Sequence, residues 1–167
     1  MIRTIITADD PPSRSRILRI PARKVSRCDT YIQRLIADMW ETMRAYGGVG
    51  LSAPQVGCSL RVLIAQAGEH KLALVNPTLE KVSVEHATDD EGCLSLPRLY
   101  VTNIERHAMV VVRGLNERGR PMRYYCGGQL ARVVQHEMDH LDGVLITQRA
   151  PSPNDLKAKV LAPVGAD

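Results

Sequence analysis

Apolar residues recur every three or four positions in two stretches of the chain. The first stretch follows Asp29, a residue type that caps helix N-termini, and it ends near Tyr46, where two glycines follow. Its apolar members are Ile32, Leu35, Ile36, Met39, Trp40 and Met43. This spacing predicts an amphipathic helix over residues 29–46, with its tryptophan and methionine side chains in the core rather than in a cofactor pocket.

The second stretch surrounds the sequence VQHEMDHL at residues 134–141. Its apolar positions with helical spacing are Leu130, Val133, Val134, Met138 and Leu141. His136 and His140 are four residues apart, so they lie on one face of the predicted helix. Their ring nitrogens can bind one metal ion, and Glu137 can reach a water on that ion. The alternative is a buried helix with two ordinary polar histidines; the full motif favours a metal site but leaves the reaction open.

Alternating apolar and polar residues, bounded by turn-forming residues, predict strands elsewhere. The predicted strands are residues 60–65, 72–75, 78–86, 107–115, 121–126 and 144–147, of which the fourth and fifth form a hairpin. The acidic run 89–91 is expected to be a solvated loop, and residues 98–105 are expected to be a loop as well. Residues 1–16 are expected to form an extended arm, exposed at residues 11–16, and residues 150–167 a loosely ordered tail.

The length of 167 residues suits one domain with a single core. The four cysteines are scattered, which indicates free thiols in a reducing compartment. The formal charge of +4 could attract a polyanion such as ribosomal RNA, but a solvated basic surface is the favoured explanation. The sequence does not predict sequence-specific nucleic-acid binding. No apolar run approaches the roughly 18 residues of a membrane span, and no signal-peptide core follows Met1. We therefore expect a cytoplasmic protein without a membrane partner, and leave an organellar location open.

Two further segments could carry chemistry. In GVGLSAPQ, residues 48–55, two glycines flank Val49 and a proline precedes Gln55. This segment is equally consistent with a simple turn and with a backbone that approaches a ligand. A catalytic metal needs a third protein ligand, and the candidates are Cys93, the acidic residues before it, and the histidines at 70, 86 and 107. Cys93 stands in EGCLSLP, where glycine and proline favour a tight loop, although a free cysteine is more often a small buried apolar residue.

Together, GVGLSAPQ (48–55), EGCLSLP (91–97) and QHEMDHLDG (135–143) resemble, in the same order, the three signature motifs of the peptide deformylases. The resemblance extends from about Ile17 to about Ile146. It implies a single α+β domain, in which the His-Glu-x-x-His helix is central, mainly antiparallel β-sheets surround it, and a second helix precedes it. It also implies hydrolysis of the N-formyl group from the N-terminal formylmethionine of newly synthesised polypeptides, with release of formate.

The resemblance assigns roles by motif. It implies that Cys93, His136 and His140 bind the metal and that Glu137 is the general acid/base. It implies that Gln55 and the backbone N–H of Leu94 are oxyanion donors and that the Gly50 backbone contacts substrate. It further implies one divalent ion per chain, ferrous iron (Fe2+) in the cell, whereas the ligand types themselves also accept Zn2+, Ni2+ or Co2+.

The chemistry of these residue types is consistent with such a reaction. A metal ion lowers the pKa of bound water from 15.7 to about 7, so that hydroxide is available as the nucleophile at neutral pH. Arg132 and Val133 precede His136 by one helical turn and could form, with Val49, a pocket for the methionine side chain. Ser52, where an alanine is common in the family, is expected to be harmless. The implied partners are nascent N-formylmethionyl peptides, near the ribosome.

Two other functions are compatible with part of the sequence. A small zinc peptidase could use the same helix, but its usual third ligand would lie downstream of His140, where little chain remains. A non-catalytic binding protein could keep the fold, but it would be expected to have lost Glu137, Gln55 or a ligand, all of which are present.

Overall fold

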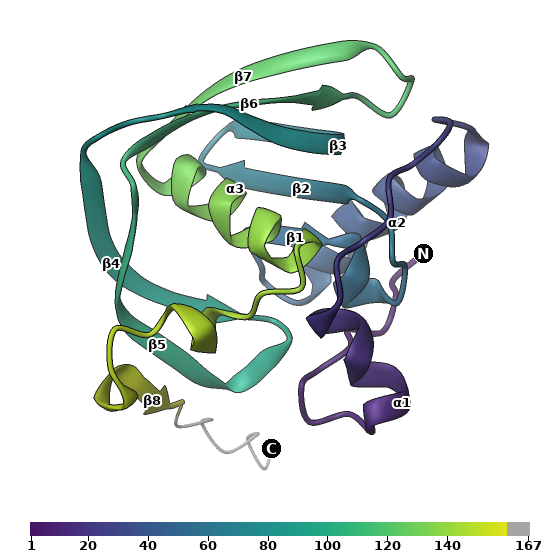
Figure 1. Ribbon diagram of the computed structural model, residues 1–167. Helices are drawn as coiled ribbons and strands as arrows, with labels where there is room; N and C mark the ends of the chain where they lie inside the picture. The colour runs from purple at the N-terminus through teal and green to yellow at the C-terminus, as the bar shows by residue number, and fades with distance from the viewer. Residues whose placement is uncertain (160–167) are drawn as a thin grey trace.

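The computed structural model describes residues 1–159 and shows a single α+β domain with two antiparallel sheets and two longer helices (Figure 1). The predicted α+β class with antiparallel sheets is therefore confirmed. In chain order the elements are α1 (Pro12–Ser15), η1 (Arg16–Arg19), α2 (Thr30–Ala45), β1 (Gly50–Ser52), η2 (Ala53–Val56), β2 (Val62–Ala67), β3 (His70–Val82), β4 (His86–Cys93), β5 (Leu96–His107), β6 (Met109–Leu115), β7 (Pro121–Gly127), α3 (Gly128–Leu141), η3 (Ile146–Arg149), η4 (Pro153–Asp155) and β8 (Leu156–Ala158), where η denotes a 3-10 helix.

The five-stranded sheet is covered by a helix on each face. Its strand order is β1-β2-β3-β6-β7, and all neighbours are antiparallel. In β2, Val62 and Ile64 join the apolar cluster of α2, whereas Leu63 and Ala65 join the cluster of α3. Successive side chains of a strand point to opposite faces, so this alternation places α2 and α3 on opposite sides of the sheet. Both faces are buried here, which explains why β2 is apolar from Val62 to Ala65.

The second sheet has the order β4-β5-β8, and it lies across α3 from the first sheet (Figure 1). Helix α3 contacts β1, β2, β6 and β7 of the first sheet and β5 of the second. Ten of its residues, from Ala131 to Leu141, are buried. Side chains of α3 therefore contact segments that are far apart in the sequence.

The two long helices form where the apolar spacing predicts them. Asp29 caps α2, because its carboxylate accepts a hydrogen bond from the backbone N–H of Ile32 at 3.1 Å. The helix ends before Gly47, whose φ of +65° is readily adopted only by glycine among common residues. Cys126 of β7 and the glycines that follow connect directly to α3, with Gly127 as the N-terminal capping position.

The predicted separate strands 72–75 and 78–86 are wrong in one respect, because β3 is one strand from His70 to Val82. Pro77 lacks a backbone donor, but it falls where the pairing with β6 shifts register between Val75 and Thr78. Asn76 adopts a φ of 52°, and its side chain bonds both the N–H and the carbonyl of Val25 at 2.8 Å. The break predicted from Asn-Pro is therefore a bulge that ties the N-terminal segment to the sheet.

The second sheet differs most from the sequence-based expectation. Residues 89–91 belong to β4 and residues 98–105 to β5, rather than to loops. Strand β8, in the segment expected to be a loose tail, pairs with β5 through Leu99–Ala158 to Val101–Leu156. The predicted strand 144–147 is replaced by the turn of η3, and the exposed loop at 11–16 contains the short helix α1. The expected loose tail also includes residues 160–167, which lie outside the described residues.

Within residues 1–159, no helix combines the length and the apolar composition that a membrane crossing requires.

Candidate active site

The three motifs meet at the surface of α3 that faces β1, η2 and the end of β4. Cys93 ends β4, and its Sγ lies 3.1 Å from Nε2 of His140. Ligand atoms of Cys93, His136 and His140 all lie within 4.8 Å of one another. One thiolate and two imidazole nitrogens at this spacing can hold a single metal ion with a position left for substrate or water. The structure thus brings together the two histidines of the motif helix and Cys93, which the family resemblance implies as the third ligand.

The polar atoms around this triad indicate that a further group belongs there. Within residues 1–159, only two buried side-chain nitrogen or oxygen atoms lack a hydrogen-bond partner, Oε2 of Glu137 and Nδ1 of His140. An unpaired buried polar atom costs about 1–3 kcal/mol, so such atoms are rare in folded proteins. Glu137 is the neighbour of the triad residue His136, whereas His140 belongs to the triad and its Nδ1 is the ring nitrogen other than the one that faces Cys93. The residues present therefore fit a metal ion and its associated water.

Burial changes the protonation of the two helical residues beside the triad. Burial, and secondarily the charge of His136, lowers the pKa of His140 well below its usual value, which favours the neutral form that binds metal. Burial raises the pKa of Glu137 to about 7, and the nearby carboxylate of Glu91 acts in the same direction, whereas His136 opposes them. A carboxylate with a pKa near neutrality can both accept and return a proton.

A buried ion network supports the triad from behind. Glu91 Oε2 lies 2.9 Å from Nδ1 of His136, and both Glu91 oxygens accept hydrogen bonds from Arg106 at 2.9 Å. Arg106 also binds Asp139 at 2.6 Å, and Arg149 binds the same carboxylate at 2.6 Å. Burial would raise the pKa of Glu91, but hydrogen bonds from Arg106 and His136 hold it well below its usual value. Glu91 is therefore an anion that fixes the orientation of His136.

Sequence reasoning missed this network, because it assigned Glu91 to a solvated loop and gave no role to Arg106, Asp139 or Arg149. One signal was available: Asp139 lies between buried apolar positions of α3, where an unpaired charge would be unfavourable. That position required a cationic partner from elsewhere in the chain. The sequence does not indicate which arginine supplies it.

Arg132 occupies a more buried position than the predicted substrate pocket required. Its guanidinium donates hydrogen bonds to Glu91 Oε1 at 2.9 Å and to the carbonyls of Ile104 and Ala87 at 3.0 and 2.6 Å. The acid that its head group binds is Glu91. Arg132 thus belongs to the ion network behind the site.

The remaining candidate residues lie around Gly50. A Cβ atom at this glycine would lie 2.5 Å from Oε1 of Glu137 and 2.6 Å from Cγ1 of Val133, so the β1 backbone is in close contact with α3. Val133 is buried beneath this contact, whereas Val49 is 47% exposed at the surface. Leu94 follows Cys93 and packs against Gly48, where a Cβ would lie 2.9 Å from Leu94 Cδ1.

Gln55 is buried in η2, with its amide directed toward Cys93. Its Oε1 accepts hydrogen bonds from the N–H and the hydroxyl of Ser52 at 2.8 and 2.9 Å. Its Nε2 lies 3.3 Å from Ser95 Oγ and 3.7 Å from Cys93 Sγ. An amide donor is thus present at the edge of the triad.

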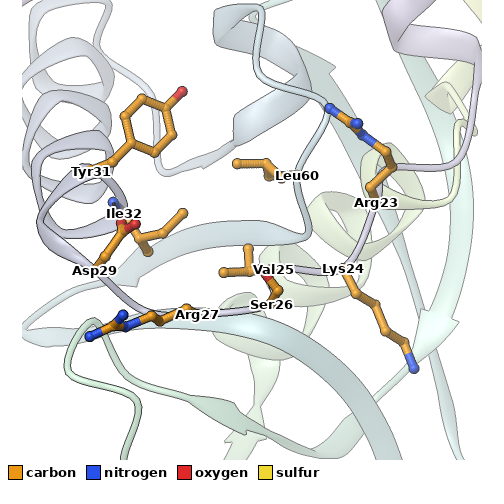
Figure 2. A pocket seen from close by; sticks show the side chains of 9 residues that line it. All are labelled: Arg23, Lys24, Val25, Ser26, Arg27, Asp29, Tyr31, Ile32 and Leu60. Atoms are coloured by element: carbon orange, nitrogen blue, oxygen red, sulfur yellow. Dashed lines mark hydrogen bonds between the residues drawn. The ribbon is translucent and has the colours of Figure 1, made fainter.

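Two surface grooves of about 310 Å³ each lie elsewhere. One is lined by residues 23–27, Asp29, Tyr31, Ile32 and Leu60 (Figure 2). Its basic side chains, Arg23, Lys24 and Arg27, point in different directions and do not converge on one point (Figure 2). The other groove is lined by residues of β3, β6 and β7 and their ends. Neither includes a residue of the three motifs.

Comparison with known proteins agrees with this geometry. The sequence matches the family described as polypeptide deformylase over residues 2–155. It is 42% identical to the peptide deformylase of Dictyoglomus turgidum over 93% of this chain and 97% of the relative. It is 44% identical to that of Dictyoglomus thermophilum over 90% of this chain and 94% of the relative.

The fold is similar to solved structures as well. The crystal structure of the peptide deformylase from Thermotoga maritima aligns with a TM-score of 0.83 at 39% identity, covering 91% of this chain and 99% of that one. The structure of the Synechococcus elongatus peptide deformylase in complex with actinonin aligns with a TM-score of 0.83 at 38% identity, covering 90% of this chain and 80% of that one. The chain therefore belongs to the polypeptide deformylase family of metal-dependent hydrolases.

Proposed function

We propose that this protein removes the formyl group from the N-terminal formylmethionine of newly synthesised polypeptides by metal-dependent hydrolysis, with release of formate. The observation that carries the proposal is the cluster of Cys93, His136 and His140, with ligand atoms within 4.8 Å, beside the buried carboxylate of Glu137. The family membership supplies the reaction class, and the triad supplies a place for the metal.

Cys93 Sγ and one ring nitrogen each of His136 and His140 are the proposed ligands. When bound, a divalent ion would lower the pKa of a water molecule to about 7 and polarise the formyl carbonyl. Ferrous iron is the proposed ion in the cell, and Zn2+, Ni2+ or Co2+ could occupy the same ligands in purified protein. Glu91, through its hydrogen bond to Nδ1 of His136, directs the other ring nitrogen, Nε2, toward the site.

Glu137 is the proposed general acid/base. Its Oε2 is buried without a partner, and its pKa of about 7 allows the carboxylate to take a proton from water and return it to the departing amine nitrogen. The neighbouring Gly50 backbone excludes solvent from one side of this carboxylate. The same group thus serves both halves of the reaction.

Gln55 and the backbone N–H of Leu94 are the proposed donors to the developing negative charge on the formyl oxygen. The Gln55 Nε2 position at the Cys93 edge supports this role, since a preorganised donor needs no rearrangement as charge develops.

The substrate backbone is proposed to lie along β1. This strand is at the edge of the five-stranded sheet, and an extended peptide can add to such an edge through main-chain hydrogen bonds. The Gly50 backbone is the proposed contact, and Val49, with Val133 beneath it, borders the methionine side chain. Arg132 is proposed to act on substrate only through the Glu91 network, because its head group is already bound there.

A location near the ribosome in the cytoplasm is also proposed, since the substrates are nascent chains. Arg23, Lys24 and Arg27 form no ion pair with any other residue between 1 and 159, and their separated head groups suit an extended polyanion such as ribosomal RNA (Figure 2). Ribosome binding that weakens with salt, and weakens further in a variant with all three replaced by glutamine, is the expected result. Equal binding by parent and variant would contradict it.

The first test is formate release from formyl-Met-Ala-Ser by protein loaded anaerobically with Fe2+, beside the Glu137→Ala variant. Release by the parent alone would support both the reaction and the role of Glu137. Absence of formate release by a folded, metal-loaded parent would refute the proposal. Cleavage of an unformylated peptide instead would indicate a peptidase.

A further inference from the structure

The side-chain amide of Gln55 is held at both ends by neighbouring serines. Oε1 accepts from the Ser52 N–H at 2.8 Å and from the Ser52 hydroxyl at 2.9 Å. At the other end, Nε2 donates to Ser95 Oγ at 3.3 Å. Ser52 and Ser95 are 0% exposed and Gln55 is 1% exposed, so water does not compete for these bonds.

The donors and acceptors around Gln55 permit only one amide orientation. Rotation of the amide by 180° would place its NH2 group against the Ser52 N–H, donor against donor, and would leave Oε1 on the side of Ser95 and Cys93. In the observed orientation Nε2 donates one hydrogen to Ser95 Oγ and directs the second toward Cys93 Sγ, 3.7 Å away, at the edge of the triad. Ser52 therefore determines which end of the amide faces the triad.

We propose that Ser52 is a positioning residue, whose hydroxyl and N–H together hold Gln55 Oε1 so that a hydrogen of Nε2 is presented to the substrate oxygen. This inference rests on the proposed deformylase function, in which Gln55 is an oxyanion donor. It replaces the expectation that serine at this position is equivalent to alanine. Alanine would keep the backbone N–H but lose the second donor, and the amide would be less strictly oriented.

The Ser52 hydroxyl also influences Glu137, on the other side of the site, by lowering the pKa of that carboxyl. A hydroxyl donates one hydrogen bond at a time, so an effect of removing it must be assigned to Gln55 or to Glu137. A double-mutant cycle with Gln55→Ala makes that assignment, because an effect that acts through Gln55 disappears once Gln55 is absent.

The kinetic test uses metal-loaded parent, Ser52→Ala, Gln55→Ala and the double variant, with Ser13→Ala as a control at an exposed position of α1. Loss of one hydrogen bond predicts that Ser52→Ala lowers kcat for formyl-Met-Ala-Ser about 3- to 10-fold with KM unchanged. The double variant is expected to match Gln55→Ala alone. An equal fold-loss from Ser52→Ala in both backgrounds, or an effect on KM alone, would overturn the proposal.

A second readout does not depend on the reaction. In zinc-loaded, ¹⁵N-labelled parent, the Nε2 protons of Gln55 are expected to exchange slowly with solvent in NMR spectra. Ser52→Ala is expected to speed this exchange with solvent. Unchanged exchange would overturn the positioning role. If the parent shows the expected slow exchange but releases no formate, the deformylase proposal fails while the positioning by Ser52 stands. Ser52→Cys, with a similar volume and a weak donor, replaces Ser52→Ala if the latter does not fold.

Discussion

Glu91 Oε2 lies 2.9 Å from Nδ1 of His136, and this contact joins strand β4 to helix α3 directly behind the proposed metal site. The same carboxylate is bound by Arg106 and Arg132, so its charge is neutralised within the core. Orientation of a ligand and stability of the fold therefore depend on one side chain.

Glu91→Gln is expected to affect stability and metal binding together. Removing one partner from a buried ion pair costs about 3–5 kcal/mol of unfolding free energy. Loss of a group that orients a metal-binding histidine lowers metal affinity about 10- to 100-fold. Urea unfolding and competition with a chelating dye measure the two effects.

Glu80→Gln is the matched control for that substitution, because its carboxylate pairs with Arg123 at 2.7 Å on the exposed side of β3. Exposed pairs contribute about 0–1 kcal/mol, so this variant should unfold almost as the parent does. Equal losses of unfolding free energy in Glu91→Gln and Glu80→Gln would show that the Glu91 network contributes no more than an exposed ion pair.

Gln55→Ala is expected to lower kcat about 100- to 1000-fold while the fold is retained, because it removes the proposed oxyanion donor. Steady-state kinetics and thermal unfolding together check the prediction. A well-folded variant with unchanged kcat would contradict the assigned role.

Gly50→Ala is expected to be poorly tolerated, because the new methyl group would lie 2.5 Å from Glu137 Oε1 and 2.6 Å from Val133 Cγ1. Overpacking of this kind costs about 1–3 kcal/mol, and the displaced carboxylate should lower kcat as well. Gly127→Ala is the control, since its Cβ would meet only Met109 Cγ at 3.8 Å. Equal unfolding midpoints and kcat in the two variants would contradict the close contact between β1 and α3.

The stability of the metal-free protein should depend on Glu137. Its pKa is raised by burial from 4.5 to about 7, so the folded state binds more protons than the unfolded state between these pH values. The contribution of a neutral Glu137 is present below pH 4.5 and is lost as the pH rises to about 7, by about 3 kcal/mol. Across this range, the parent should therefore lose unfolding free energy relative to Glu137→Gln as the pH rises. A constant difference would show that Glu137 has an ordinary pKa.

The sequence predicts the elements whose signal is local. The spacing of Leu35 and Met39 in α2, and of Val134 and Met138 in α3, gives helices at the observed positions, and the hairpin of β6 and β7 follows from alternation and a polar turn. The three motifs likewise identify residues that the fold brings together.

Strands β4 and β5 could not be predicted in this way. The charged residue Glu91 is buried because its carboxylate is bound by Arg106 from the neighbouring strand β5 and by Arg132 from α3. Such a position has the local appearance of a solvated loop. Its stability comes from charges 15 and 41 residues away, which no short sequence window contains.

The same separation in sequence has a consequence for folding. Cys93 and His140 are 47 residues apart, and Glu91 and His136 are 45 apart, so the proposed ligands meet only after the second sheet has docked on α3. A chain in which only the five-stranded sheet has formed would hold two histidines but neither the thiolate nor the supporting carboxylate. Metal uptake should therefore be one of the last events of folding, and a bound ion would shift the folding equilibrium toward the native state by mass action. The ion proposed to take part in the reaction would therefore also hold the end of β4 against α3.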